Sequence, residues 1–457
     1  MSSAVEQLAK NANWGAFAKA TELKQRILFV LGALIIYRLG TYIPVPGIDP
    51  TVWKEIYDQK GGGILDMFNM FSGGALSRMT IFALNIMPYI SASIIMQLAA
   101  AMSPSLEKMK KEGEQGRMKI NQYTRYLTVL LASVQAYGLA VGLESMQGSS
   151  GAAVIDPGLF FRASTVITIV GGTIFLMWLG EQITQRGIGN GISLIIFAGI
   201  VAEFPRALGS TLELGRQGQF NLIELLALAA MVVGVIVLIV YVERAQRRVV
   251  VQYPKRQQAA GQAAMGQQNH IPLKLNTSGV IPPIFASSLL LLPLTIVGFS
   301  GTEGGEITAT IARYLQHGEP MYMLLYGGLI IFFAFFYTAI VFNPEDNAQM
   351  LQRHGGFIPG IRPGKSTAEY LDYVLTRITA VGAIYLCFIC LLPELLISRY
   401  SIPFYFGGTS LLIVVTVTMD TVAQIHSHLI AHQYEGLVKK AKLRGTGRGG
   451  AGRQRRR

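Results

Sequence analysis

Charged residues and cysteines are scarce in this sequence. Only 14% of the 457 residues are charged, and just two are cysteines. Soluble globular proteins carry about 25% charged residues, so this composition, with 51% hydrophobic residues, excludes an ordinary soluble domain and indicates a polytopic membrane protein. Two cysteines cannot form a disulfide framework, and Cys387 and Cys390 share one apolar run. We expect both to be ordinary helix residues.

Motifs for enzymatic chemistry are also missing. The sequence contains no H-E-x-x-H, no G-x-S-x-G and no G-x-x-x-x-G-K-[ST] pattern, which argues against proteolysis and nucleotide hydrolysis by this chain. His428 and His432 have i, i+4 spacing but no acidic third ligand nearby, so a solvated helix face is the favoured interpretation. We expect no catalytic residues, no cofactor and no metal.

Long apolar runs are abundant. Ten of them approach the length of about 20 residues that a membrane-spanning helix needs, although the fifth is short. They cover residues 27–43, 81–101, 126–143, 163–180, 191–205, 222–242, 278–298, 321–342, 378–397 and 406–425.

The basic residues predict the orientation of these spans. The first residues lack the pattern of a secretory signal, so we expect the N-terminus to stay inside, and ten spans then place both termini there. Of the 39 Lys and Arg residues, 30 fall in the segments expected inside, as the positive-inside rule requires. The basic end, KKAKLRGTGRGGAGRQRRR, exceeds what orientation needs, and a disordered tail on anionic lipid and contact with ribosomal RNA both remain open.

Loop lengths repeat in a similar rhythm in the two sets of five spans. Because five is odd, two copies would have opposite senses in the membrane, as in inverted-repeat folds, and a pathway would run between them. An ion-coupled secondary transporter is therefore an alternative function. Such carriers use ionisable groups at mid-membrane, whereas the polar residues inside these spans are mostly amides and hydroxyls, which join helices by hydrogen bonds. They include Asn85, Ser91, Ser93, Gln97 and Gln135.

The stretch GGGILDMFNMFSGGALSRM, residues 61–79, predicts a short amphipathic helix. Its apolar residues fall at helical spacing, with Asp66 and Asn69 off that stripe. A helix from Ile64 to Leu76 would reach only roughly 20 Å, too short to cross a bilayer core of about 30 Å. Glycines at both ends free it from its neighbours.

Several spans combine glycine or proline with isoleucine, as in NIMPYISAS, GNGISLIIF, GVIPPIFASS and FGGTSLLIVV. Irregular backbone at membrane depth is tolerated where protein or a cavity satisfies the freed backbone groups. Isoleucines near such points either pack against lipid and protein or form an apolar ring. A ring of that kind would dewet a narrow neck and exclude ions.

Seven motifs carry a resemblance to a known family, in the order MFNMFSGGALSR, FALNIMPYISASI, FLMWLGEQITQRGIGNGIS, GVIPPIFASS, FNPEDNA, GFIPGIRPG and PFYFGGTSLLIVV. Over residues 21–443 the chain resembles bacterial SecY, the channel subunit of the general protein-secretion translocon. The resemblance implies an all-α polytopic membrane protein with ten transmembrane helices, built as two inverted five-helix halves around an hourglass pore. It also implies transport of unfolded secretory polypeptides across the cytoplasmic membrane, release of transmembrane segments sideways into lipid, and both termini in the cytoplasm.

The resemblance assigns the segments as follows. Residues 1–26 are an inner N-terminal segment, 27–205 and 206–427 are the two halves, and 428–457 are a basic tail. Inner loops cover 243–277 and 343–377. The short helix, here 62–76, is the plug that closes the resting channel, with side chains Ile64, Leu65, Met67, Phe68, Met70 and Phe71.

Carried over motif by motif, the resemblance implies three further groups of residues. The pore ring comprises Ile86, Ile90, Ile192, Ile196, Ile284 and Ile413. The edges of a lateral gate, between the second and third spans and the seventh and eighth, are Ser91, Gln135, Asn276 and Leu292. Contacts to the motor or ribosome come from Arg362, Lys255 and Arg256. The implied partners are the small subunits SecE and SecG, the SecA motor ATPase, the ribosome, YidC, an unfolded polypeptide and membrane lipid.

Three features depart from the family pattern. Asn85 stands where a glycine is usual and is expected to alter the closed state. The stretch QQAAGQAAMGQQNH contains no Lys or Arg, which weakens the expectation of ribosome binding by that loop. Pro283 follows Pro282 and is expected to stiffen or bend the seventh span.

Overall fold

The computed structural model describes residues 21–60, 69, 72–148, 151–218, 221–253, 269–299, 319–400 and 408–446. Within these residues, ten helices each overlap one of the ten predicted spans. They are α3 (Thr21–Gly40), α6 (Met87–Met102), α8 (Glu114–Ser145), α9 (Leu159–Arg186), α10 (Gly191–Arg216), α11 (Leu222–Arg244), α12 (Ile281–Phe299), α14 (Pro320–Val341), α16 (Lys365–Tyr400) and α17 (Gly408–Thr446).

Seven helices in the described part of the chain, namely α8, α9, α10, α11, α14, α16 and α17, contain segments long and apolar enough to cross a membrane. An eighth span results if α6 and the short helix α7 (Pro104–Lys111), which meet at 104°, are taken together. The remaining described helices are α4 (Pro50–Lys60) and α15 (Pro344–Arg353).

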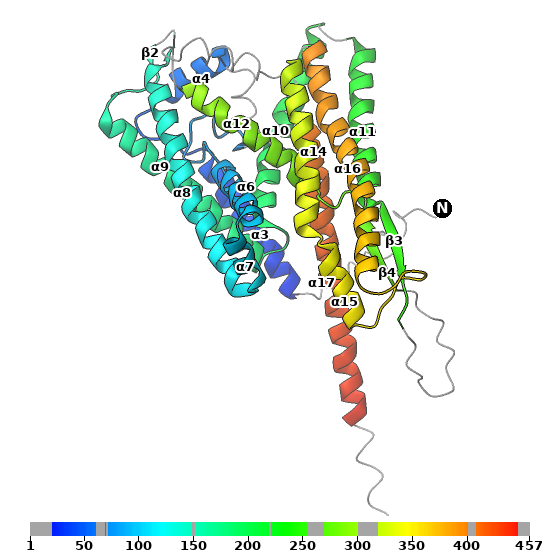
Figure 1. Ribbon diagram of the computed structural model, residues 1–457. Coiled ribbons are helices and arrows are strands. Elements are labelled where there is room, and N and C mark those ends of the chain that lie inside the picture. Colours follow the sequence, from blue (N-terminus) through cyan, green and yellow to red (C-terminus); the bar gives the residue numbers. More distant parts are fainter. Residues whose placement is uncertain are drawn as a thin grey trace, which may run out of the picture.

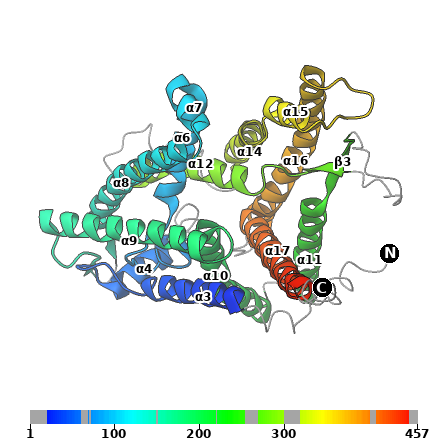
Figure 2. The same cartoon turned by 90° about the horizontal axis from the view of Figure 1, so that it is seen from below.

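The helices form two groups that stand side by side (Figures 1 and 2). Helices α3 to α10 make one group, and α11 to α17 make the other, with α12 lying between α8 and α14 (Figure 2). The predicted boundary between residues 205 and 206 is wrong, because α10 continues through Pro205 to Arg216. Its added turns expose Leu208 and Leu212, so the fifth span is extended by apolar residues that follow the proline.

The second span begins later than predicted. Residues 81–86 form turns, and α6 starts only at Met87, with Pro88 in its first turn, where a missing N–H has no helical partner to lose. Asn85 has φ +48° and is buried. Glycine and asparagine are the residues that best tolerate this left-handed conformation, which explains physically how Asn85 replaces a glycine.

Pro283 was expected to stiffen or bend the seventh span, and its position at the start of the helix favours the first of these effects. Pro282 and Pro283 lie in the first turn of α12, where proline starts a helix without breaking it. The seventh span therefore begins at Ile281, after the predicted residue 278, and the residues before it form a separate linking segment.

Two short antiparallel hairpins interrupt the helical architecture. One is β1 (Gln147–Gly148) with β2 (Gly151–Ala152), and the other is β3 (Gln246–Val251) with β4 (Asn269–Lys274). The second hairpin was not anticipated, because its strands lie at the two ends of a polar loop. It places the predicted inner loops 243–277 and 343–377 together, at the lower end of Figure 1.

The basic end that begins at Lys439 is helical in its first part, where a disordered tail was one of the two alternatives. Helix α17 continues to Thr446, well beyond its apolar section. Lysine-rich sequence has good helix propensity, so a helix that starts in an apolar environment can extend into a polar one. Residues 447–457 lie outside the described part, as do residues 1–20.

Candidate functional site

The six isoleucines of the predicted ring all face the interior. Ile86, Ile90, Ile196 and Ile413 are at most 7% exposed and belong to one large apolar cluster. Ile192 and Ile284 are partly buried and pack against the same cluster. They come from α6 and its N-terminal turn, α10, α12 and α17, so elements from both helix groups contribute. The assignment of a ring remains a prediction, but none of the six is turned outward.

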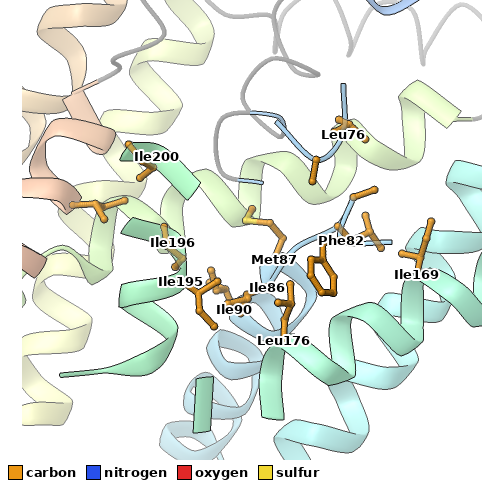
Figure 3. Close-up of a cluster of buried hydrophobic side chains, with 14 of the residues drawn as sticks. Leu76, Phe82, Ile86, Met87, Ile90, Ile169, Leu176, Ile195, Ile196 and Ile200 are labelled. Atoms are coloured by element: carbon orange, nitrogen blue, oxygen red, sulfur yellow. The ribbon is translucent and has the colours of Figure 1, made fainter. Parts of the chain in front are cut away.

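Part of this cluster is visible in Figure 3, where Ile86 and Ile90 lie beside Ile195 and Ile196 of α10. Ile195 is 0% exposed and was not predicted, although it lies one helical turn from Ile192 on the same run. Met87 also points toward this group (Figure 3). The apolar waist, defined here as Ile86, Ile90, Ile195 and Ile196 of the first helix group in one buried cluster with Ile413 of the second, is closed by side-chain packing.

The plug side chains that the sequence predicted, Ile64, Leu65, Met67, Phe68, Met70 and Phe71, lie outside the described residues. The described part shows helical backbone at Asn69 and Ser72, followed by turns from Gly73. The predicted helix end at Leu76 is therefore wrong. Gly73 and Gly74 have φ of +65° and +81°, a conformation that ends a helix at a glycine.

The last residues of the predicted plug and those that follow it, 72–81, are attached to the first helix group by hydrogen bonds. Tyr37 and Arg38 of α3 donate hydrogen bonds to the Ser72 and Gly73 carbonyl oxygens, at 3.3 and 2.7 Å. Trp53 of α4 donates its indole N–H to the Leu76 carbonyl at 3.0 Å.

This attachment continues along the chain. Val45 donates its N–H to the Met79 carbonyl at 2.9 Å, and Ile81 donates to Ile43 at 3.0 Å. Helix α3, helix α4 and the residues between them thus hold the backbone at the end of the predicted plug. Sequence reasoning missed Tyr37, Arg38 and Trp53, although an arginine near the end of an otherwise apolar span was a usable signal.

Gly73 also meets α10 at close range. A Cβ atom on Gly73 would lie 2.8 Å from the Cα of Gly199. This approach requires glycine at position 73, because a real Cβ cannot come so near to backbone atoms.

We expect Gly73→Val to destabilise the protein more than Gly218→Val, by about 1–3 kcal/mol, the usual cost of overpacking. Both glycines have positive φ, at +65° and +77°, so both variants suffer backbone strain, but a Cβ on Gly218 would have nothing within 4 Å. The thermal unfolding midpoint in detergent measures the difference. Equal midpoints for the two variants would show that the contact with Gly199 is not tight.

The predicted lateral gate falls on a seam between the helix groups. Helix α12 packs against α6 and α8 of the first group, and Ser91 of α6 is 6% exposed. Gln135 of α8 has a buried side-chain oxygen without a hydrogen-bond partner among the described residues. Leu292 lies in α12, but its side chain is outside the described part.

Asn276 has a different setting from the one expected at a gate edge. Its side-chain amide donates to the Glu243 carboxylate at 2.6 Å and to the Gly279 carbonyl at 3.1 Å, within the second helix group. One of its hydrogen bonds thus reaches α11, and the other stays within the turn before α12. The role of Asn276 at the gate stays a prediction.

The two inner loops pack together as one unit, which we call the loop end. Val249 and Leu273 of the β3–β4 hairpin form an apolar cluster with Ile358, Leu371 and Val374. A backbone bridge between Gln252 and Phe357 joins the loops directly.

Arg362 projects from this unit. Its side chain is exposed, and its carbonyl accepts a hydrogen bond from the Thr367 hydroxyl at 2.9 Å, which orders the turn independently of the guanidinium. Asn343 begins α15 by accepting the N–H of Glu345 at 3.1 Å, which explains the FNPEDNA motif as a helix start. Lys255 and Arg256 lie outside the described residues.

The structure thus has two groups of membrane-spanning helices, a closed apolar waist at their junction, and an anchored segment, residues 72–81. Together these features define a polytopic membrane channel. The family model described as SecY matches residues 80–422. The chain belongs to the SecY family.

Individual comparisons agree with this result. The chain is 56% identical over 428 residues, 93% of its length, to the protein translocase subunit SecY of Escherichia coli strain K12, of which it covers 96%. One similar solved structure is described as showing that the plug domain of the SecY protein stabilises the closed state of the translocation channel and maintains a membrane seal, with TM-score 0.62, 20% identity and coverage of 88% and 92% of the two chains.

A second is the Sec61 channel in the canine ribosome-channel complex, with TM-score 0.62, 18% identity and the same coverage. The predicted resemblance and fold class are confirmed, and the chain is a multi-pass membrane protein. The few hairpin residues do not alter the helical class.

Proposed function

We propose that the chain is the pore-forming subunit of a protein translocase, which conducts unfolded polypeptide across a bacterial cytoplasmic membrane and releases apolar segments sideways into lipid. The observation that carries this proposal is the closed apolar waist. Packed isoleucines repel water and ions, yet their dispersion contacts have no fixed direction and yield to a passing chain. Membership in the SecY family supports it.

The transporter alternative is not supported. The family match and the curated relative from Escherichia coli point to a translocase, and the waist residues that we describe are apolar. SecY is not an enzyme family, so the energy for movement is proposed to come from a partner.

Cross-linking of a stalled secretory chain is the direct test. We expect cysteines at Ile90 and Ile196 to cross-link to a cysteine in the stalled chain, because these side chains lie at the waist. A cysteine at Leu28, which is 66% exposed on α3, is the control and should not react. Reaction at Leu28 with none at the two waist positions would contradict the proposed pathway.

We also propose that the loop end faces the cytoplasm, as its basic residues favour, and that both termini lie on that side. The ribosome-bound relative supports a ribosome and a nascent polypeptide as partners. SecE, SecG, the SecA motor, YidC and lipid contact by the basic end are further proposed partners that rest on the family resemblance. The ring, plug and gate assignments belong to the same proposal.

A further inference from the structure

Helix α12 connects the two helix groups, and its base is held by a short linking segment. The helix contacts α6 and α8 across the seam and α14 on its own side. Residues 275–280 join β4 to α12 (Figures 1 and 2). Any opening of the seam that moves α12 must also move or bend this link.

The link is tied to the end of α11 by two hydrogen bonds. Leu275 donates its N–H to the Ala245 carbonyl at 2.9 Å, and the Asn276 amide donates to the Glu243 carboxylate at 2.6 Å. The second bond has a charged acceptor and a buried donor, since Asn276 is only 4% exposed. Such bonds are stronger than neutral ones, and a buried donor that loses its acceptor is costly.

The other contacts of Asn276 shape the link itself. Its amide also donates to the Gly279 carbonyl at 3.1 Å, and its side-chain oxygen accepts the Ser278 hydroxyl at 3.2 Å. Gly279 has φ +63°, so the chain turns sharply just before α12. Asn276 therefore connects the shape of this turn to the position of Glu243.

Helix α16 packs against the linking segment, residues 275–280. A Cβ on Gly382 would lie 2.8 Å from the Leu275 carbonyl oxygen, so the link is seated directly on that helix. Lys274, Asp420 and Tyr385 lie within electrostatic range of Glu243. The carboxylate is thus enclosed by the second helix group and directed at the link.

We propose that Glu243 is a positioning residue for the seam: its hydrogen bond to Asn276 holds the base of α12 against α11 and so favours the closed channel. This inference rests on the proposed function and adds to it a residue that is not part of the waist. Loss of the bond shifts the balance between closed and open seam toward open, on the order of tenfold for one charge-assisted hydrogen bond.

The test compares export of a secretory protein with an intact signal and of the same protein with a weakened signal, in cells that carry only the variant channel. We expect Glu243→Ala and Asn276→Asp to raise the ratio of weakened-signal to intact-signal export about tenfold. In Asn276→Asp, two carboxylates face each other and repel. Ser278→Ala is the control, because it removes a neighbouring hydrogen bond and leaves the contact between Glu243 and Asn276 in place.

The double variant Glu243→Gln with Asn276→Asp restores an amide-to-carboxylate hydrogen bond with the roles exchanged. The exchange does not restore the bond that Asn276 donates to the Gly279 carbonyl, so we expect its ratio to fall clearly below that of Asn276→Asp, toward that of the unaltered protein. A double variant that is as permissive as Asn276→Asp alone, or that fails to accumulate, would overturn the proposal. If the single variants lost export of both proteins equally, with no change in the ratio, the proposal would also be overturned. If the unaltered channel exported neither protein, the proposed function itself would be refuted instead.

Discussion

Deletion of residues 62–76 is expected to raise the resting ion conductance of the channel several-fold in reconstituted vesicles. The waist is closed by side-chain packing alone, and a second barrier at the outer mouth is what the short amphipathic segment adds in the proposed function. Without this segment, no second barrier blocks ions when thermal motion opens the waist. Conductance of planar bilayers or release of a trapped dye measures the effect, and an unchanged leak would remove the role of the plug.

The structure makes a sharper version of this experiment available. Residues 62–76 include the anchored carbonyls of Ser72, Gly73 and Leu76, so that deletion also removes the acceptors of these three hydrogen bonds from Tyr37, Arg38 and Trp53. Deletion of residues 62–68 alone keeps those bonds. We expect the shorter deletion to leak as well. If only the longer deletion leaks, the anchored turn rather than the short helix provides the seal.

Reversal of charge at Arg362 is expected to reduce motor-dependent export about tenfold or more, as for an arginine at the centre of a protein interface. The side chain is exposed, and the Arg362→Glu variant leaves the backbone hydrogen bond from Thr367 in place, so the loop keeps its shape. Membrane insertion and accumulation should stay normal. Export rates of a secretory protein in inverted vesicles supplied with the motor and ATP measure the loss.

Arg353→Glu is the matched control for this variant, because Arg353 is also exposed on the same loop, at the end of α15. The charge change is identical. An equal loss in both variants would indicate a general electrostatic effect of the loop end, and normal export by Arg362→Glu would remove the docking site altogether.

The positions of the spans were largely predictable because each apolar run must be long enough to cross the membrane and must satisfy its own backbone hydrogen bonds. This constraint is local, and it placed all ten helices. Helix ends were less predictable. Pro205 lies inside α10, which continues past it, whereas the two prolines of α12 begin that helix, and the sequence did not distinguish these positions.

The site shows the same division. The isoleucines of the ring were identified by motif, and the structure shows them buried or partly buried, but their neighbour Ile195 and the anchors Tyr37, Arg38 and Trp53 were missed. These anchors act through partners 23 to 35 positions away, and no short pattern records such pairs. The hairpin that unites the two inner loops was missed for the same reason.

Composition, apolar periodicity and motifs by themselves determined that this chain is a multi-spanning membrane protein of the SecY type, because hydrophobic length and local turn chemistry are written along the chain. Only the tertiary structure decided which backbone carbonyls at the end of the predicted plug accept hydrogen bonds. It also decided that Gly73 lies against Gly199 and that Asn276 donates a hydrogen bond to Glu243. Those outcomes depend on how separate helices pack against one another, and packing brings together residues whose spacing in the sequence carries no signal.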